Sequence, residues 1–203
     1  MKDSTIAAKI GCRLYVLSIF LVYVIPSTIG ILMVHTGNQF ALSQRDKIVG
    51  AALRTDKAAM NHHSGDKLTA ALYHFGGNVF IAAIPQTVTG LAIAPPYFTV
   101  AYQGWVGGIV SVDGSHQSRF TSFKPSANYF IVLLLQIAAF SPSIVAGIKC
   151  GVDTYKHSTE VSWRFWKFRI PKESIVAVSH VYLVSLSIFL FASCFEFLSS
   201  WNM

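Results

Sequence analysis

Charged residues avoid four long windows of this chain. No Asp, Glu, Lys or Arg occurs in residues 14–44, 68–112, 125–148 and 174–195, which are 31, 45, 24 and 22 residues long. A helix needs about 20 mostly apolar residues to cross the hydrocarbon core of a bilayer. Every window reaches that length, and the second is long enough for two crossings. The apolar runs are continuous rather than alternating, which favours helices over the strands of a membrane barrel.

The windows predict an all-α, polytopic membrane helix bundle that forms a single domain, residues 1–203, with about five transmembrane helices. The stretch from Tyr97 to Val112 is about 16 residues long, which is short for a full crossing. It is either a tilted fifth span or a re-entrant half-helix buried in protein. Pro95-Pro96 separates it from the preceding span. The expected spans are 14–34, 71–94, 97–112, 125–148 and 174–195.

Composition agrees with a location in the membrane. Hydrophobic residues make up 53% of the chain, charged residues only 12%, and the mean hydropathy is +0.50. The net charge of +7 would also suit a nucleic-acid-binding protein. The basic residues, however, flank the apolar spans, as expected for contacts with anionic lipid headgroups and for topology signals. We therefore expect an integral membrane protein with no nucleic-acid partner.

Two connecting segments have the composition of membrane-surface elements. Residues 149–173 form a basic amphipathic connector in which aromatic rings alternate with cations, a pattern typical of the headgroup layer. Its membrane-interface candidates are Trp163, Arg164, Trp166, Lys167 and Arg169. Residues 44–60 are predicted to form a short interfacial helix.

Small and polar residues within the spans are the main candidates for helix packing and partner contact. Small residues allow helices to approach closely, and amides form hydrogen bonds across such contacts. The same amides could instead line a polar path or a cofactor pocket. Glu196 borders the last span, where an acid is either functional or an anchor at the interface. The candidates are Asn78, Gly90, Gln103, Gly104, Gly107, Gln136, Gly147, Gly151 and Glu196.

Patterns of catalytic or metal-binding residues are weak. The pair His62-His63 with Asp66 has ligand types that suit zinc or copper, but adjacent histidines rarely present both rings to one ion. The three cysteines have no metal or redox spacing, and the chain lacks a nucleophile elbow and a nucleotide-binding motif. We therefore expect neither an enzyme nor a metal site. His74, His116 and His180 leave a haem or chlorophyll ligand open, so the cofactor is undetermined.

Three landmarks together resemble the stage II sporulation protein M family of integral membrane proteins. They are Asn78 with Ala82, Ala83 and Gly90 leading to Gln103-Gly104; the segment Gly147-Ile148-Lys149-Cys150-Gly151; and the segment from Ala192 to Ser199 with Glu196. Their order and spacing cover about Tyr73 to Leu198. The family's usual His and Glu before the second landmark are replaced here by Val132 and Gln136. The resemblance implies an all-helical protein without a catalytic site, in a bacterial or archaeal cytoplasmic membrane.

The number of spans decides the topology. Five spans with the N-terminus inside place nine Lys and Arg residues on the cytoplasmic side and seven outside. A re-entrant 97–112 segment would place the basic segments 39–67 and 149–173 on the same side of the membrane. That side would then hold eleven Lys and Arg residues and the other side five, which fits the positive-inside rule better. The family resemblance favours five spans.

Three functions are compatible with the sequence. The first is a non-catalytic subunit that scaffolds or stabilises a larger membrane complex through contacts with other membrane proteins. The second is a permease subunit that moves a lipid or small solute, because Pro95-Pro96 breaks a helix as transporter sites often do. The third is an accessory subunit of an electron-transfer or light-harvesting complex that contacts a pigment or quinone through the abundant aromatic residues.

Overall fold

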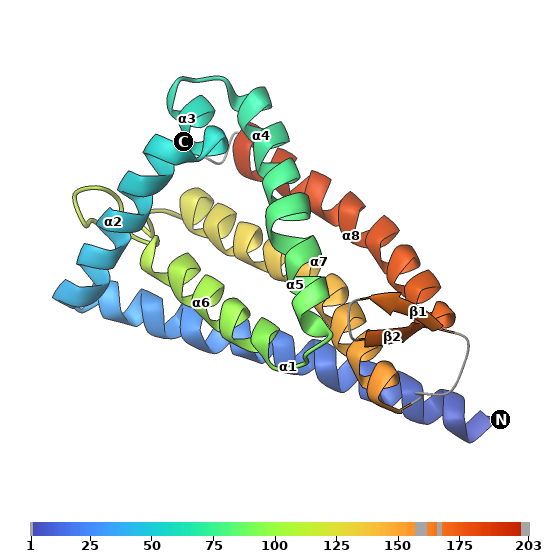
Figure 1. Ribbon diagram of the computed structural model, residues 1–203. Helices are drawn as coiled ribbons and strands as arrows, with labels where there is room; N and C mark the ends of the chain where they lie inside the picture. Colours follow the sequence, from blue (N-terminus) through green and yellow to red (C-terminus); the bar gives the residue numbers. More distant parts are fainter. Residues whose placement is uncertain (1, 157–161, 166–167, 200–203) are drawn as a thin grey trace.

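The computed structural model describes residues 2–156, 162–165 and 168–199 and is built almost entirely of helices (Figure 1). In chain order the elements are α1 (Lys2–His35), α2 (Gln39–Thr55), α3 (Lys57–His63), α4 (Lys67–Gly76), the π-helical segment η1 (Gly77–Ala83), α5 (Ile84–Gly90), α6 (Pro95–Ile109), α7 (Phe123–Lys156), β1 (Ser162–Phe165), β2 (Phe168–Pro171) and α8 (Lys172–Leu198).

Four helical stretches among the described residues are long and apolar enough to cross a membrane. They are Arg13–His35, Lys67–Gly90, Phe123–Tyr155 and Lys172–Leu198. Large apolar side chains such as Ile81, Leu134 and Leu183 are exposed on their outer faces, which is costly in water but not against lipid chains. The predicted all-α, multi-pass membrane bundle is therefore confirmed.

Helix α6 accounts for the difference between the expected five spans and the four observed. It has 15 residues, too few for a full crossing of the hydrocarbon core. It nevertheless runs parallel to α1, with Gly104 against Tyr23 and Gly108 against Ser27. It thus returns the chain to the end of the bundle where α1 finishes. The expected number of spanning-length helices is corrected to four, because Pro95-Pro96 starts α6 part-way along α1.

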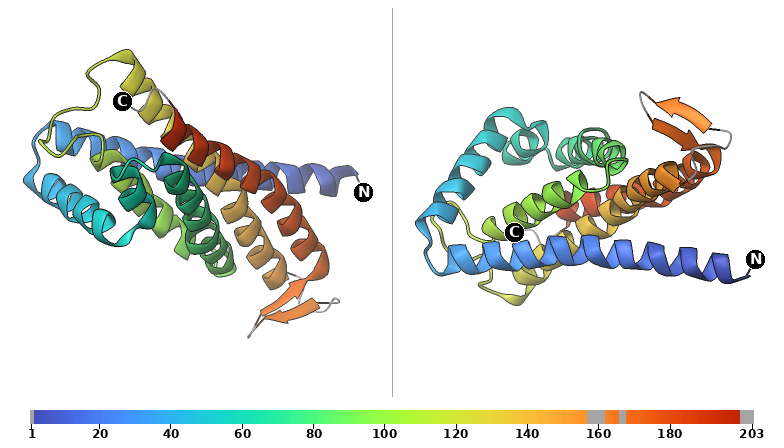
Figure 2. Two further views of the ribbon diagram at one scale, coloured as in Figure 1. Left: turned by 90° about the horizontal axis from the view of Figure 1, so that it is seen from above. Right: turned by 60° about the horizontal axis from the view of Figure 1, so that its bottom comes forward.

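The bundle has two distinct ends. The α2 end holds the C-terminal end of α1, the helices α2 and α3, the loop 110–122 and the C-terminal end of α8, whose Phe197 packs with Ala58 and Ala70. The hairpin end holds the N-terminal end of α1, the C-terminal end of α7 and the strands β1 and β2 (Figure 2). The loop 110–122 lies beside α2, which is the arrangement of the five-span topology. The re-entrant alternative would separate these two segments, so the contact between His116 and Asp46 favours the five-span arrangement.

The second spanning helix changes its helical register part-way. Pro85 lacks a backbone N–H and would clash with the preceding turn of a regular α-helix. The π-helical segment η1 precedes it, and the Ile84 N–H bonds to the Val79 carbonyl five residues back. The helix then ends at Gly90, and Ile93 adopts a positive φ of 67° in the turn before α6. Such a φ is uncommon for a β-branched residue, so this turn holds local strain.

The interfacial segments differ in detail from the sequence expectation. The predicted helix 44–60 is two helices, because Asp56 ends α2 and caps α3 by accepting a hydrogen bond from the Ala58 N–H at 2.8 Å. The basic connector contains an antiparallel hairpin that pairs Trp163 with Ile170 and Arg164 with Arg169. Trp166 and Lys167 lie outside the described residues, as do the side chains of Trp163, Arg164 and Arg169. Their contact with lipid headgroups stays a prediction.

Candidate functional site

A cavity of about 940 Å³ lies between the helices and is lined by polar side chains from several of them. Helices α1, α4, α6, α7 and α8, the segment η1 and the loop 110–122 all contribute to its wall. The sequence candidates Asn78, Gln103, Gln136 and Glu196 come together here. The polar lining residues include Tyr23, His62, His74, Asn78, Gln103, Asp113, Gln117, Arg119, Asn128, Tyr129, Gln136 and Glu196.

One face of α7 forms the long wall of the cavity. Its lining residues recur at every third or fourth position, with adjacent pairs at 128–129 and 132–133, so they share one side of the helix. Fifteen residues separate Pro125 from Phe140, a length of about 22 Å along a helix axis. The cavity therefore extends well into the bundle from the α2 end. The lining positions of α7 are Pro125, Asn128, Tyr129, Val132, Leu133, Gln136 and Phe140.

The part of the cavity between α4, α7 and the C-terminal end of α8 holds a polar cluster centred on His74 and Glu196. The Glu196 Oε2 atom lies 3.5 Å from His74 Nε2 and accepts a hydrogen bond from Gln136 Nε2 at 3.2 Å. His74 Nδ1 lies 3.0 Å from the Ser193 hydroxyl, and the Asn78 amide nitrogen lies 3.3 Å from His74 Nε2. Polar contacts thus join α4, η1, α7 and α8. Away from water, such contacts strengthen one another.

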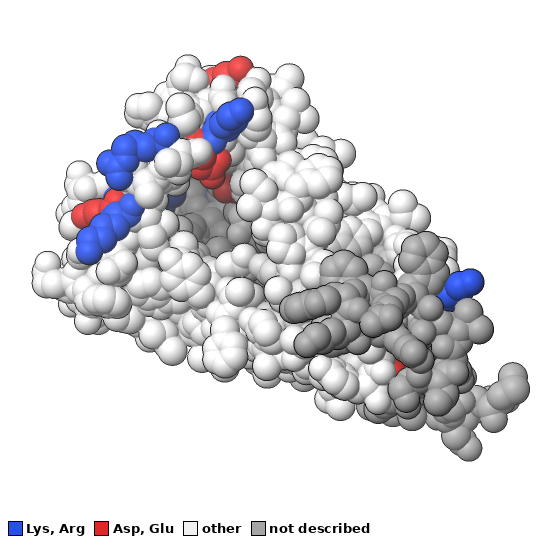
Figure 3. All heavy atoms as spheres, viewed as in Figure 1, with Lys and Arg blue, Asp and Glu red and all other residues white. Residues whose placement is uncertain are grey.

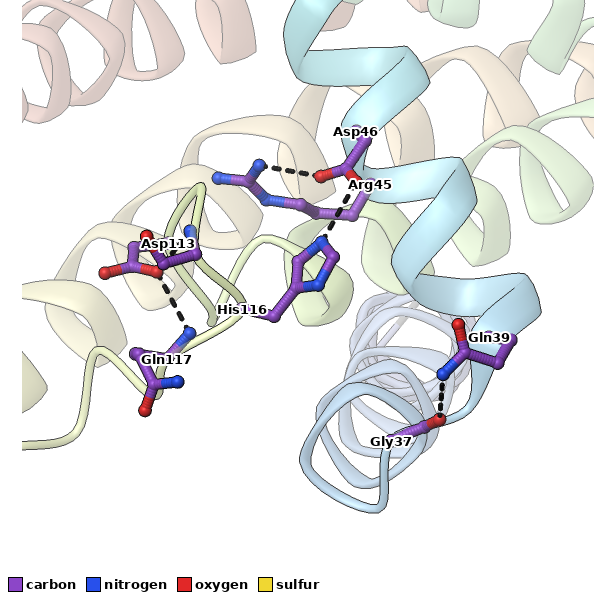
Figure 4. A network of polar contacts seen from close by, with 8 residues as sticks. Gly37, Gln39, Arg45, Asp46, Asp113, His116 and Gln117 are labelled. Atoms are coloured by element: carbon purple, nitrogen blue, oxygen red, sulfur yellow. Dashed lines mark hydrogen bonds and ion pairs between the residues drawn. The ribbon is translucent and has the colours of Figure 1, made fainter.

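The mouth of the cavity lies at the α2 end, beside a second polar network. Asp113 Oδ1 accepts hydrogen bonds from the backbone N–H groups of Ser115 and Gln117, at 2.8 and 2.9 Å (Figure 4). These bonds, together with the nearby charges of Arg45 and Arg119, hold the pKa of Asp113 below its ordinary value. The loop 110–122 is therefore closed on itself by an ionised carboxylate.

Asp46 on α2 tethers the loop to the interfacial helix. Its Oδ1 accepts a hydrogen bond from Arg45 Nη1 at 3.0 Å, and its Oδ2 lies 2.9 Å from His116 Nε2. The hydrogen bonds from Arg45 and His116 lower the pKa of Asp46. Space-filling atoms show a hollow between α2, α4 and α6, with Lys and Arg gathered over α2 at its rim (Figure 3).

The cavity is closed toward the hairpin end by tight packing of α5, α7 and α8. The rings of Phe140 and Phe189 meet edge to face with centroids 4.8 Å apart. Below them, the Thr87 hydroxyl donates to the Ser143 carbonyl at 2.9 Å and lies 2.7 Å from the Tyr182 hydroxyl. The described residues thus form a cavity open at one end of the bundle and sealed at the other.

Four of the five candidate glycines lie where helices of this chain touch. A Cβ added to Gly147 would lie 2.9 Å from the Thr87 carbonyl carbon, and one added to Gly90 would lie 2.8 Å from the Gly147 carbonyl carbon. Gly151 meets Leu91, and Gly104 meets Tyr23, in the same way. Because these glycines contact helices within the chain, they are not free to bind another protein.

Gly107 differs from the other four candidates. Its Cβ position lies 3.1 Å from a side-chain atom of Leu133 and 3.3 Å from the Tyr23 hydroxyl, so no backbone of another helix meets it closely. Its carbonyl accepts a hydrogen bond from the Tyr129 hydroxyl, and it lines the cavity. Gly107 therefore belongs to the cavity wall.

Several lining residues did not stand out in the sequence. Tyr23, Arg119 and Tyr129 gave no motif. Asn128 did carry a usable signal, since it lies eight residues before Gln136 and two helical turns place both on one face. His74 was considered as a pigment or haem ligand and as a neighbour of the His62-His63 pair, whereas it contacts Glu196.

The other histidines do not form a metal site among the described residues, where no group of three or more His, Cys, Asp or Glu residues could hold an ion. Asp66 instead caps α4 by accepting a hydrogen bond from the Thr69 N–H at 3.1 Å. His116 contacts Asp46, and the exposed His180 lies 2.9 Å from the Val176 carbonyl of its own helix. Asp66, His116 and His180 therefore each have a contact within the chain that explains their position.

Comparisons of the chain with protein-family models, curated proteins and solved structures found no match.

Proposed function

We propose that this chain is a permease subunit that admits a small polar solute or a lipid headgroup to a cavity inside the membrane. One observation carries the proposal: polar side chains from separate helices converge on one cavity of a largely apolar bundle. The cavity volume of about 940 Å³ lies in the range of ligand-binding sites, which is roughly 300–1,000 Å³.

Helix packing alone does not account for this polar lining. Amides that only join helices would be satisfied by one another. The side chain of Asn128 is buried, at 7% exposure, and its Oδ1 atom has no hydrogen-bond partner among the described residues. An unsatisfied buried acceptor costs roughly 1–3 kcal/mol. Such a cost is tolerated where an enclosed water molecule supplies the missing donor.

The one-ended shape of the cavity also supports a permease. Transporters expose their site to one side of the membrane at a time, and interrupted helices often border that site. Here α5 and α6 are separated by the turn that contains Ile93, and η1 places Asn78 on the cavity wall. Movement of the α5–α6 pair against α7 would open the hairpin end.

A non-catalytic scaffold, the first hypothesis from the sequence, stays a prediction. Four of the glycines expected at partner contacts are covered by other helices of the same chain, whereas the basic aromatic connector 149–173 stays a candidate contact surface. Membership of the stage II sporulation protein M family, a bacterial or archaeal origin, complex partners and a pigment or quinone stay predictions from the sequence alone.

Binding and flux measurements on purified protein test the permease proposal. We expect at least one member of a panel of small polar solutes and phospholipid headgroups to raise the melting temperature and to be taken up by proteoliposomes. Gln136→Leu should remove both effects. The control Leu134→Ala alters an outward-facing side chain on the same helix and should retain them. A panel that neither binds nor crosses, with protein that remains folded, would contradict the proposal.

A further inference from the structure

We infer that Arg119, with Arg45 behind it, forms an anion subsite at the cavity mouth that receives the phosphate of a glycerol phosphate group. This inference rests on the proposed function, because the subsite is the entrance of the same cavity. The same chemical group occurs in a soluble ester and in the headgroup of phosphatidylglycerol, so two sources share one recognition chemistry.

Arg119 presents donors that nothing in the described part of the chain uses. Its backbone N–H donates to the Ser111 carbonyl at 2.9 Å, which fixes the position of the residue in the loop. Arg119 lines the cavity, and its guanidinium group makes no hydrogen bond or ion pair with any described residue. A guanidinium carries five N–H donors in a planar fork that matches two oxygens of a phosphate.

The acids beside Arg119 are engaged elsewhere. Asp113 uses Oδ1 for the backbone of its own loop. Asp46 uses Oδ1 for Arg45 and Oδ2 for His116. Neither carboxylate lies within ion-pair distance of the Arg119 guanidinium. An external anion can therefore bind Arg119 without displacing an existing ion pair.

Arg45 adds a second positive charge close to Arg119. The residue is only 5% exposed, and its Nε atom has no hydrogen-bond partner among the described residues. Figure 4 shows its side chain extending from α2 toward the Asp113 loop. Arg119 is solvent-exposed, yet partial desolvation by the surrounding loop, followed by the charge of Arg45, lowers the pKa of its guanidinium group. A bound anion would relieve this repulsion.

Asn128 indicates what accompanies the anionic group. It lines the same cavity, beside Tyr129, and Tyr129 lies within electrostatic reach of Arg119. Its side-chain amide belongs to the cavity wall and can pair with a hydroxyl group of a ligand. A phosphate ester whose glycerol carries a free hydroxyl supplies both the anion for Arg119 and a hydroxyl partner for the Asn128 amide.

The position of the subsite suits access from both sources. The loop 110–122 is tethered to α2, at the end of the spanning helices where headgroups lie. A soluble ester would enter from water, and a lipid headgroup would enter from the interface. The hollow at the α2 end is bordered by both basic and acidic side chains (Figure 3).

Binding of two probes to the delipidated full chain in a neutral detergent tests the inference. The probes are glycerol 3-phosphate, followed by calorimetry, and phosphatidylglycerol, followed by native mass spectrometry. At least one should bind, and Arg119→Gln should weaken it about tenfold or more, while Arg119→Lys weakens it less. The control Lys124→Gln removes a cation five residues away that does not line the cavity and should have no effect.

A second variant separates the hydroxyl contact from the charge. Asn128→Leu should weaken glycerol 3-phosphate binding several-fold and leave binding of inorganic phosphate unchanged. Binding of neither probe to wild-type protein, or equal binding to wild-type and Arg119→Gln protein, would overturn the inference. If the cavity still admits water-soluble thiol reagents at Asn128→Cys and Gln136→Cys, the proposed function survives that failure. If neither cysteine reacts, both the anion subsite and the permease proposal are contradicted.

Discussion

His116 and Asp46 are 70 residues apart in sequence, yet His116 Nε2 lies 2.9 Å from Asp46 Oδ2. This contact joins the loop that follows α6 to the helix that follows α1. Helix α6 must therefore bring the chain back to the end it left through α4 and α5. A helix too short to count as a span by length still acts as a return crossing in the topology.

This topology predicts which residues share a side of the membrane. Ser43→Cys on α2 and Ser115→Cys in the loop 110–122 should both react with an impermeant thiol reagent added to the same side. Lys172→Cys, at the start of α8, should react only from the opposite side. All three residues are exposed, so a lack of reaction would not reflect burial. Labelling of positions 43 and 115 from opposite sides would contradict the fold of α6.

Close contacts at Gly147 predict a sharp loss of stability on adding one methyl group. Gly147→Ala would place Cβ against the backbone of Thr87, which cannot move like a side chain. We expect destabilisation of at least about 1–3 kcal/mol, the range for overpacking, measured by unfolding in detergent. Gly50→Ala on α2 meets nothing within 4 Å and should be neutral or stabilising, because Ala favours helix. Equal effects at both positions would contradict the α5–α7 packing.

The loop 110–122 should have an acid-sensitive contribution to stability. The folded-state pKa of Asp113 is lowered from its ordinary value of 3.8, so the ionised form stabilises the fold. This stabilisation is fully present above the unfolded-state pKa, near 4, and is lost as the pH falls through the folded-state pKa. Asp113→Asn keeps the shape but removes the charge. Its melting temperature should lie below that of wild-type protein at pH 6.

The difference in melting temperature between wild-type and Asp113→Asn protein should shrink as the pH falls below 4. Asp113 is solvent-exposed, so we expect the difference to be small and to decrease with added salt. A difference that stays constant from pH 6 to pH 3 would show that the carboxylate charge does not hold the loop.

Sequence reasoning found the membrane helices because a long charge-free window has one structural solution in lipid. It also placed Gly90, Gly104, Gly147 and Gly151 on packing faces. It could not tell which helix packs against each of them, or whether that helix belongs to the same chain. A glycine contact inside a chain and one between chains have the same local pattern. Similarly, Asn78 and Gln136 were singled out separately, yet their convergence on one cavity depends on how α7 packs against η1.

Other features of the site depend on contacts between distant segments. Arg119 reads as an ordinary loop cation until α6 brings the loop to α2. His74 and Glu196 are separated by more than one hundred residues, and only the antiparallel packing of α7 and α8 with α4 joins them to Gln136. Local propensity carries no information on such pairings.

The most direct test of the account is the access of water to the α7 face of the cavity. Asn128→Cys, Gln136→Cys and Leu134→Cys would be made in a background in which Cys12, Cys150 and Cys194 are replaced by serine. We predict that an impermeant thiol reagent applied to the α2 side labels positions 128 and 136 but not the outward-facing position 134. Absence of labelling at 128 and 136, with Ser115→Cys labelled in the same membranes, would contradict an open polar cavity.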